Sequence, residues 1–193
     1  MNTIVFIRHG ITEGNQKKYY YGASDIPLTK EGIAALQERR IAGIYPNPEG
    51  FAFVTSMLKR TEQTLYEIYG EVPHRKDPRL DEMNFGTFEM KSYEMLKDEP
   101  EYIEWISGDN LANVCPEGES WTEVFERAKA AFEEYRNGNY IIVCHGGIII
   151  SLMQSLFPEN NMNIYEWLPN PCEGYSVDFS DDGKPVSYKA IKL

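Results

Sequence analysis

Two of the three histidines, His9 and His145, occupy the same kind of place in the sequence. Each comes at the end of a short apolar run and precedes a glycine, and in open α/β sheets ligands bind at the carboxyl ends of the strands. Arg8 stands beside the first histidine, and Arg60 follows a third apolar run. A nucleophile surrounded by cationic donors is what the transfer of a phosphoryl group requires. The four side chains therefore predict a phosphate pocket.

The segments that must position these side chains predict an alternation of strands and helices. The apolar runs are typical of buried central strands, and they span Ile4–Ile7, Phe51–Val54 and Tyr140–Cys144. Helical spacing and capping residues predict helices from Thr29 to Ile44, from Ser56 to Gly70, from Ser120 to Asn137 and from Ile148 to Phe157. This pattern predicts an α/β fold, a three-layer α/β/α sandwich with a mostly parallel central sheet and helices on both faces.

Two further segments complete the expected organisation. Residues 77–119 are broken by prolines and glycines and contain only short helical pieces, so we expect a small helical insertion that covers the site. Tyr175–Phe179 and Val186–Ile191 flank a turn and predict a hairpin at the edge of the sheet. At 193 residues the chain is expected to form one domain, residues 1–193.

Charge and hydropathy exclude two classes of partner. The formal net charge of −11 repels polyanions over long range, so we expect no nucleic-acid partner. The most apolar stretch, residues 140–157, is interrupted by polar and glycine residues, so we expect no membrane span and no membrane partner. A few buried arginines can still reverse the potential inside one pocket and bind a small phosphorylated metabolite.

The cysteines and the amino terminus predict a cytoplasmic protein. Three widely spaced cysteines without a C-x-x-C pair favour neither a disulfide framework nor a zinc site. The first residues, Met1–Ile7, reach Arg8 at once and lack the basic and apolar regions of a signal peptide. The histidines also lack the spacing of metal ligands, so we expect no metal and no cofactor.

Several motifs resemble the histidine phosphatase, or phosphoglycerate mutase-like, superfamily. The residues from Arg8 to Asn15 resemble its R-H-G-x-T-x-x-N signature. The further matches, in the order of the family, are Asp25-x-Pro27-Leu28-Thr29, Ser56-x-x-x-Arg60-Thr61, Leu80-x-Glu82 with Phe85-Gly86, Pro116-x-Gly118-Glu119-Ser120, and His145-Gly146. The resemblance spans nearly the whole chain and points to the phosphatase branch, which includes broad-specificity phosphatases and α-ribazole phosphatases.

The resemblance implies a role for each matched residue. His9 would be the nucleophile that becomes phosphohistidine, in a reaction that needs no metal. Glu82 would protonate the leaving alcohol and then activate water. The residues implied to bind the phosphoryl group or the substrate are Arg8, Asn15, Gly22, Arg60, His145 and Gly146. The expected activity is the hydrolysis of a phosphomonoester of a small metabolite.

Three positions near the implied acid need separate interpretation. Many relatives carry Trp-Glu-Gly where this chain has Phe88-Glu89-Met90, so we expect Met90 to alter the loop and Glu89 to have a structural role. Whether Glu82 or Glu89 lies closer to the leaving group stays open. Glu119 is expected to support the start of the following helix, through its dipole or by pairing with an arginine.

Two alternative functions remain. A cofactor-dependent phosphoglycerate mutase would return the phosphoryl group from the same histidine to a second hydroxyl, although this chain is short for that class. A non-catalytic module would only bind phosphorylated ligands. A serine esterase lacks its G-x-S-x-G elbow here, and a cysteine phosphatase lacks its C-x5-R loop.

The substrate and the oligomeric state are not defined by these motifs. We expect the specificity residues in the insertion, around Tyr93, Tyr102, Trp105 and Asn110, where they would face the leaving group. The hairpin could expose an edge strand, so both a monomer and a homodimer are compatible with the sequence.

Overall fold

The computed structural model describes residues 1–108, 111–160 and 163–193. The main sheet has six strands in the order β4-β3-β6-β1-β7-β8. The strands are β1 (Asn2–Arg8), β3 (Ala52–Thr55), β4 (His74–Lys76), β6 (Tyr140–Cys144), β7 (Gly174–Phe179) and β8 (Pro185–Ile191). The first four strands of that order are parallel, and β7 and β8 pair antiparallel at one edge. This confirms the predicted sheet and its terminal hairpin.

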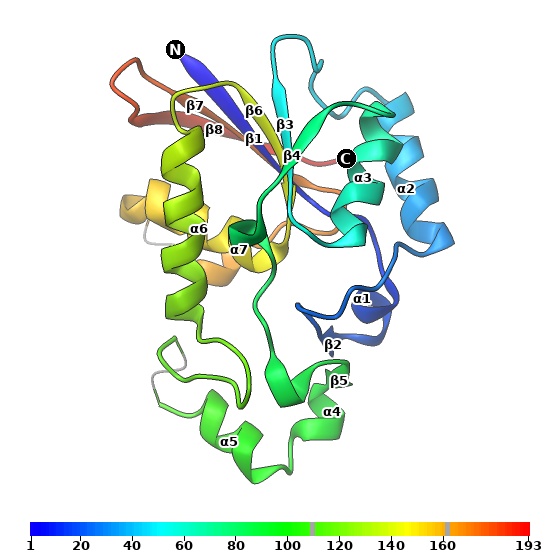
Figure 1. Cartoon of the computed structure of the whole chain (residues 1–193), viewed down its shortest axis with the longest axis vertical. Helices are drawn as coiled ribbons and strands as arrows, with labels where there is room; N and C mark the ends of the chain where they lie inside the picture. The colour runs from blue at the N-terminus through cyan, green and yellow to red at the C-terminus, as the bar shows by residue number, and fades with distance from the viewer. Residues whose placement is uncertain (109–110, 161–162) are drawn as a thin grey trace.

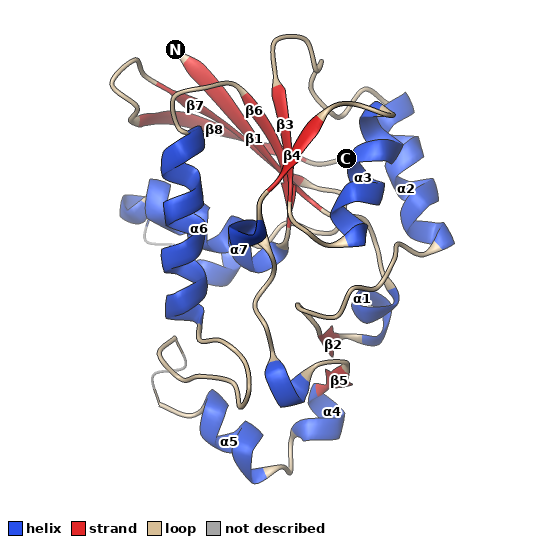
Figure 2. Ribbon diagram, viewed as in Figure 1, coloured by secondary structure: helices blue, strands red, loops and turns tan. Residues whose placement is uncertain are grey.

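Helices cover both faces of the sheet, as Figures 1 and 2 show. On one face lie α2 (Lys30–Ile41) and α3 (Lys59–Tyr69), and on the other α6 (Trp121–Tyr135) and α7 (Gly146–Leu156). Thr29 caps α2, and Ser120 forms a capping box with Glu123 at the start of α6. The three-layer α/β/α sandwich expected from the sequence is therefore the observed fold.

Strand β1 explains why the sheet is covered on both sides. Its four residues Ile4–Ile7 have no exposed surface. Ile4 and Phe6 pack into the core beneath α6 and α7, whereas Val5 and Ile7 pack into the core beneath α2 and α3. Alternate side chains of a strand point to opposite faces, so a continuous apolar run requires two apolar layers. Each fully buried side chain of this kind stabilises the fold by about 2 kcal/mol.

The register of the parallel strands brings three loops to one edge. Arg8 pairs with Cys144 across β1 and β6, and Thr55 pairs with Val143 across β3 and β6. The residues that follow these strands, His9, Ser56 and His145, therefore leave the sheet at the same side. This is the carboxyl edge, where open α/β sheets bind ligands.

The insertion lies beyond this edge and is joined to the amino-terminal loop (Figure 1). Its elements are the 3₁₀ turns η1 (Pro78–Leu80) and η2 (Gly86–Phe88), strand β5 (Lys91–Ser92) and helices α4 (Tyr93–Leu96) and α5 (Pro100–Ile106). Strand β5 pairs antiparallel with β2 (Tyr19–Tyr20), which follows the short helix α1 (Glu13–Lys17). The amino-terminal loop that carries the phosphatase-like motif is thus held to the insertion.

Some details differ from the sequence prediction. The helix α2 ends at Ile41, three residues before the predicted end at Ile44, and Ile41 is 87% exposed. The edge strand β4 and the short elements α1 and β2 have no distinct apolar pattern, and sequence reasoning missed them. Two 3₁₀ turns, η3 (Pro158–Asn160) and η4 (Ile164–Trp167), follow α7.

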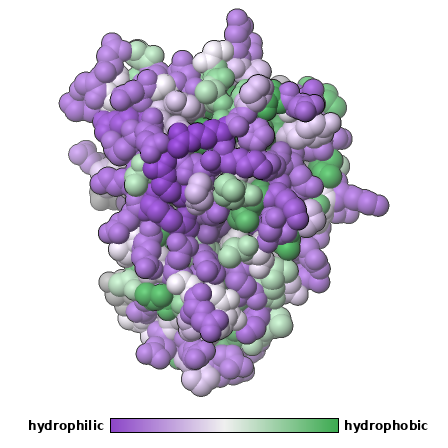
Figure 3. Space-filling model, viewed as in Figure 1, coloured by the Kyte–Doolittle hydropathy of each residue, from purple (hydrophilic) through white to green (hydrophobic). Residues whose placement is uncertain are grey.

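The surface is largely polar. The face in Figure 3 is mostly hydrophilic, with small separate hydrophobic areas. In the part of the chain that the structure describes, no helix has both the length and the apolar character needed to cross a bilayer.

Candidate active site

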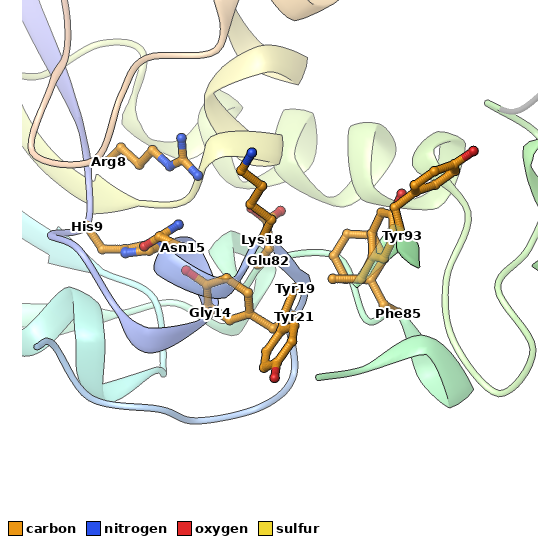
Figure 4. A pocket seen from close by; sticks show the side chains of 11 residues that line it. Arg8, His9, Gly14, Asn15, Lys18, Tyr19, Tyr21, Glu82, Phe85 and Tyr93 are labelled. Carbon is orange, nitrogen blue, oxygen red and sulfur yellow. The ribbon is translucent and has the colours of Figure 1, made fainter. Parts of the chain in front are cut away.

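A cavity of about 450 Å³ opens at the carboxyl edge of the sheet. Its lining comes from the loop after β1, from α1 and β2, and from the insertion, as Figure 4 shows. The lining residues are Arg8, His9, Gly14, Asn15, Lys18, Tyr19, Tyr20, Tyr21, Glu82, Phe85 and Tyr93. Four residues predicted from the sequence, Arg8, His9, Asn15 and Glu82, therefore share one cavity.

His9 is held in one tautomer. Its Nδ1 lies 2.7 Å from the carbonyl oxygen of Gly10, and a carbonyl oxygen can only accept, so Nδ1 carries the proton. The other ring nitrogen, Nε2, then has a free lone pair. Burial, followed by the charges of Arg60 and Arg8, keeps the pKa of His9 well below its usual 6.5. The ring is therefore neutral at pH 7, as a nucleophile must be.

His145 and Arg60 lie fully buried behind the first histidine. The two histidine rings are 5.2 Å apart between centroids. Nε of Arg60 donates to Nδ1 of His145 at 3.3 Å, so the Nε2 proton of His145 is given to Oγ of Ser56 at 2.8 Å. Burial, and after it the charge of Arg60, holds the pKa of His145 well below 6.5. Neither residue lines the cavity, and the ring of His145 packs against the ring of His9.

Arg8 has a donor without a partner. Its Nη1 donates to the carbonyl of Pro169 at 2.7 Å, but its buried Nε has no acceptor in the described chain. A Cβ on Gly146, at the start of α7, would lie 3.3 Å from this Nε. A guanidinium beside the positive end of a helix is unfavourable unless an anion lies between them. The arrangement is that of an anion site.

Asn15 is oriented by the turn that starts α1. Its Oδ1 accepts from the backbone N–H and the hydroxyl of Thr12, each at 3.0 Å. The side-chain amide group, with two donors, is then left for the cavity, where Figure 4 shows Asn15 beside His9. A capping box, Thr12 with Asn15, fixes this geometry.

Tyr21 was not identified from the sequence. Its hydroxyl is hydrogen-bonded to the hydroxyl of Thr12 at 2.7 Å, and the Arg60 guanidinium lies 5.0 Å from its ring centroid. Any Cβ on Gly14 would come within 2.5 Å of this ring. Tyr21 therefore fixes the position of Arg60 through a cation–π contact, and the glycine in the motif is needed to admit it. The position of Tyr21 in the sequence, six residues after Asn15, does not indicate that its ring contacts Arg60.

Glu82 reaches the start of α7. Its Oε2 accepts from the backbone N–H of Gly147 at 3.0 Å, and its Oε1 accepts from the N–H of Met83 at 3.0 Å. A Cβ on Gly147 would lie 2.4 Å from Oε1. Only glycine at this position allows the carboxylate to approach the start of α7. Gly146 thus leaves room for the guanidinium of Arg8, and Gly147 leaves room for the carboxylate of Glu82.

The segment that carries Glu82 is held by Arg127 of α6. The guanidinium of Arg127 pairs with Glu119 through Nε and Nη2, at 2.8 and 2.9 Å. It also donates to the carbonyls of Arg79, Asp81 and Glu82. The expectation that Glu119 pairs with an arginine is confirmed.

Glu89 fixes the loop that supports Arg60. Its carboxylate accepts the backbone N–H groups of Gly22, Ala23 and Ser24 at 2.8–3.1 Å. The carbonyls of Gly22 and Ser24 accept in turn from Arg60 at 2.8 and 2.9 Å. Glu89 does not line the cavity, which agrees with the structural role expected for it.

Gly22 is placed differently from the expectation of a phosphate contact. Its N–H is given to Glu89, and it does not line the cavity. A Cβ there would lie 1.6 Å from the carbonyl oxygen of Met83, so glycine is required by close backbone approach. The residue acts on the site through Arg60.

The expected specificity residues divide into two groups. Tyr93 lines the cavity, but Tyr102 and Trp105 are only 2% and 8% exposed and pack with Tyr20 and Phe88 in a small core of the insertion. The prediction that Tyr102 and Trp105 face the leaving group is wrong, because these rings supply the insertion with its own apolar core. Asn110 lies outside the described residues.

No group of three or more His, Cys, Asp or Glu side chains within residues 1–108, 111–160 and 163–193 is arranged to hold a metal ion. The site of the described chain is instead made of two guanidinium groups, two neutral imidazoles, an amide and a carboxylate. Together with the parallel sheet, these groups define an α/β protein with a cationic pocket suited to a phosphoryl group.

Comparison with known proteins agrees with this class. Residues 4–191 match the model of the histidine phosphatase superfamily (branch 1), and the chain belongs to this superfamily. Members of the superfamily are phosphatases or mutases.

Individual relatives carry both kinds of name. The chain is 33% identical over 166 residues to a Yersinia pestis protein named "Probable phosphoglycerate mutase GpmB", covering 81% of this chain and 75% of that protein. The structure resembles the α-ribazole phosphatase of Shigella flexneri, with a TM-score of 0.79, 24% identity and coverage of 95% and 93% of the two chains. It also resembles a phosphoserine phosphatase of Entamoeba histolytica solved with 3-phosphoglyceric acid, with a TM-score of 0.76, 23% identity and coverage of 96% and 94%. At these identities the two structures show the shared fold.

Proposed function

We propose that this protein is a metal-independent phosphomonoester hydrolase that acts through a phosphohistidine at His9. The observation that carries the proposal is the pairing of a neutral histidine, with its Nε2 lone pair free, and a buried Arg8 Nε that has no acceptor within the described chain. A phosphoryl group supplies what both lack, an electrophile for the first and an anionic acceptor for the second.

In the first step Nε2 of His9 attacks phosphorus, and the bond from phosphorus to the ester oxygen breaks. Arg8, Asn15 and the N–H of Gly146 at the start of α7 stabilise the negative charge on the phosphoryl oxygens. Arg60 completes the site from beneath, since its Nη1 and Nη2 each keep a second hydrogen beyond those given to Ser24 and Gly22. His145 accepts from Nε of Arg60 and so helps to hold this guanidinium in place. Glu82 gives its proton to the leaving alcohol.

In the second step water attacks the phosphohistidine. Glu82, now a carboxylate, accepts a proton from that water, the bond between Nε2 and phosphorus breaks, and inorganic phosphate leaves with His9 restored. The cycle uses one water molecule and regenerates Glu82 in its acid form.

Hydrolysis is favoured over mutase chemistry by the rim of the cavity. Lys18 is exposed and the side chain of Tyr93 is 52% exposed, so the cavity meets bulk water. A mutase must keep its phosphorylated intermediate away from water until a second hydroxyl attacks.

Phosphate release from a panel of phosphomonoesters, in excess EDTA, tests the function. Wild type should release phosphate, the activity of His9→Ala should fall at least 10³-fold, and His74→Ala should keep wild-type activity because that histidine is exposed and does not line the cavity. No release by wild type, or equal release by His9→Ala, would overturn the proposal. Conversion of 3-phosphoglycerate to its 2-isomer without release would favour the mutase instead.

The choice between Glu82 and Glu89 as acid is tested with two leaving groups. A p-nitrophenolate leaves without protonation, whereas an alkoxide requires an acid. Glu82→Gln should therefore slow alkyl phosphates at least 100-fold more than p-nitrophenyl phosphate. Glu89→Gln should slow both esters by the same factor, because it disturbs Arg60 through the loop. The opposite pattern would assign the acid to Glu89.

The proposed partner is a small phosphorylated metabolite, with no nucleic acid, no cofactor and no metal. A cytoplasmic location is proposed from the cysteines, since Cys115, Cys144 and Cys172 are free, buried thiols, which reducing compartments preserve.

A further inference from the structure

The cavity extends well beyond the phosphoryl site. Figure 4 shows His9 and Asn15 at one end and Phe85 and Tyr93 at the other, with Lys18 between them. A phosphoryl group on His9 fills only the first end, so the alcohol part of a substrate must lie along Lys18 toward the aromatic end. The side chains here act on the leaving group and not on the phosphoryl group.

Lys18 has an unusual backbone conformation. Its φ of 54° and ψ of 43° lie in the left-handed region, which costs a non-glycine residue free energy. Its N–H donates to the carbonyls of Gly14 and Asn15 and so closes α1. The turn directs the side chain of Lys18 to the cavity that Asn15 also lines.

The backbone after Lys18 is held in place from two sides. The N–H of Met90 donates to the carbonyl of Tyr20 at 2.8 Å, and the hydroxyls of Tyr20 and Tyr102 are 2.6 Å apart. Strand β2 is thereby joined to the insertion. The ammonium group of Lys18 is therefore carried by a fixed backbone, although the side chain itself is exposed.

Lys18 differs from the adjacent Lys17 in its ion pairing. Lys17 forms an ion pair with Glu13 and does not line the cavity. Within the described residues Lys18 has no carboxylate within ion-pair distance, although the whole chain has a formal net charge of −11. Apart from Arg8, Lys18 is the one cationic residue among those that line the cavity.

Resting on the proposed hydrolase, we propose that Lys18 is a specificity residue that binds a second anionic group on the substrate. The substrates selected are phosphomonoesters whose alcohol carries a carboxylate or another phosphate a few bonds from the ester oxygen. Arg8 takes the reacting phosphoryl group, and Lys18 takes the second anion through its three N–H donors. The contact lies at a solvated rim, so it changes specificity by a modest factor, about 2- to 5-fold.

Matched pairs of substrates distinguish the binding of a second anionic group from a general electrostatic attraction of the phosphoryl group. Glycerol 3-phosphate and 3-phosphoglycerate differ only in a hydroxymethyl group and a carboxylate. Propane-1,3-diol monophosphate and bisphosphate differ only in a second phosphate. The preference is the ratio of kcat/KM for the anionic member to that for the neutral member of each pair.

The test variant is Lys18→Asn, because asparagine tolerates the left-handed conformation and lacks the charge. It should lower the preference about 2- to 5-fold through KM of the anionic substrate, with kcat/KM for the neutral substrate unchanged. Lys18→Arg should restore the preference, and Lys17→Asn, the matched control, should leave it as in wild type. The pair that responds more strongly identifies the anion as carboxylate or phosphate.

Three outcomes would overturn the inference. An equal loss for both members of a pair would show that Lys18 only attracts the reacting phosphoryl group. An unchanged preference in Lys18→Asn would show that it contacts no second anion. Absence of any turnover by wild type would overturn the proposed hydrolase itself, and this inference with it, so the two failures are distinguishable.

Discussion

Nδ1 of His9 lies 2.7 Å from the carbonyl oxygen of Gly10. The backbone carbonyl of the next residue in the sequence thus determines the tautomer of His9. In this contact the acceptor is a neutral carbonyl and not a carboxylate. A carboxylate would raise the basicity of the ring and favour the imidazolium. A neutral carbonyl orients the ring and leaves Nε2 unprotonated at pH 7, which is the form that the proposed attack on phosphorus requires.

The two buried histidines should make the fold sensitive to mild acid. Burial, followed by the nearby arginines, lowers the pKa of His9 and of His145 in the folded state, whereas an unfolded histidine titrates near 6.5. Below pH 6.5 the unfolded chain takes up protons that the folded chain does not, so stability falls as the pH falls. The loss at pH 5 has an upper limit of about 2 kcal/mol for each histidine, which the unfolded-state pKa of 6.5 sets.

Urea unfolding followed by tryptophan fluorescence at pH 7 and pH 5 measures this loss. The variant His145→Gln should lose about half as much free energy of unfolding between the two pH values as wild type, whatever its stability at pH 7. An equal loss in both proteins would show that His145 is not the source of the proton uptake.

Arg127 should act on catalysis through Glu82, because it donates to the carbonyls of Arg79, Asp81 and Glu82. Lysine cannot make this set of contacts. In Arg127→Lys, kcat for an alkyl phosphate should fall about 10-fold, with a smaller fall for p-nitrophenyl phosphate, whose leaving group needs no acid.

The matched control for this prediction is Lys129→Met, an exposed position on the same helix, which should leave both rates unchanged. Equal slowing of the two esters by Arg127→Lys would mean that Arg127 supports the fold without positioning Glu82.

The sequence predicted those features that depend on local order along the chain. Each strand and the residue after it can be identified from an apolar run that ends at a polar residue, so the arrival of His9 and His145 at one edge follows from the topology. The capping boxes are likewise local, and Ser120 with Glu123 was expected.

Contacts between distant segments could not be predicted in this way. Glu89 meets the N–H of Gly22 across 67 residues, so nothing in the sequence near Gly22 indicates that its donor is used. The aromatic residues of the insertion gave no basis for separating Tyr93, which lines the cavity, from Tyr102, which is buried. The left-handed conformation of Lys18 could not be predicted from the sequence either, because lysine rarely adopts it.

Met90 should be a source of instability. Its φ of 60° is in the left-handed region, at the position where the family resemblance led us to expect glycine. Met90→Gly should raise the free energy of unfolding by about 0.5–1 kcal/mol, because the strain of the side chain outweighs the added entropy of the unfolded chain.

Thermal or urea unfolding of Met90→Gly measures this gain. Lys91→Gly, one residue further along in β5 and free of positive φ, should destabilise the protein and serves as the matched control. Destabilisation by Met90→Gly would mean that packing of the methionine side chain exceeds its backbone strain.

The phosphohistidine at His9 is the central claim, and trapping it is the most direct test. Wild type is mixed with a ³²P-labelled phosphomonoester on the millisecond scale, quenched in alkali and digested, and the peptides are identified by mass spectrometry. The account predicts a label that is stable in alkali, is lost in acid and maps to the peptide containing His9, with none in His9→Asn. Label at another residue, or rapid hydrolysis by wild type with no labelled protein at any time, would contradict it.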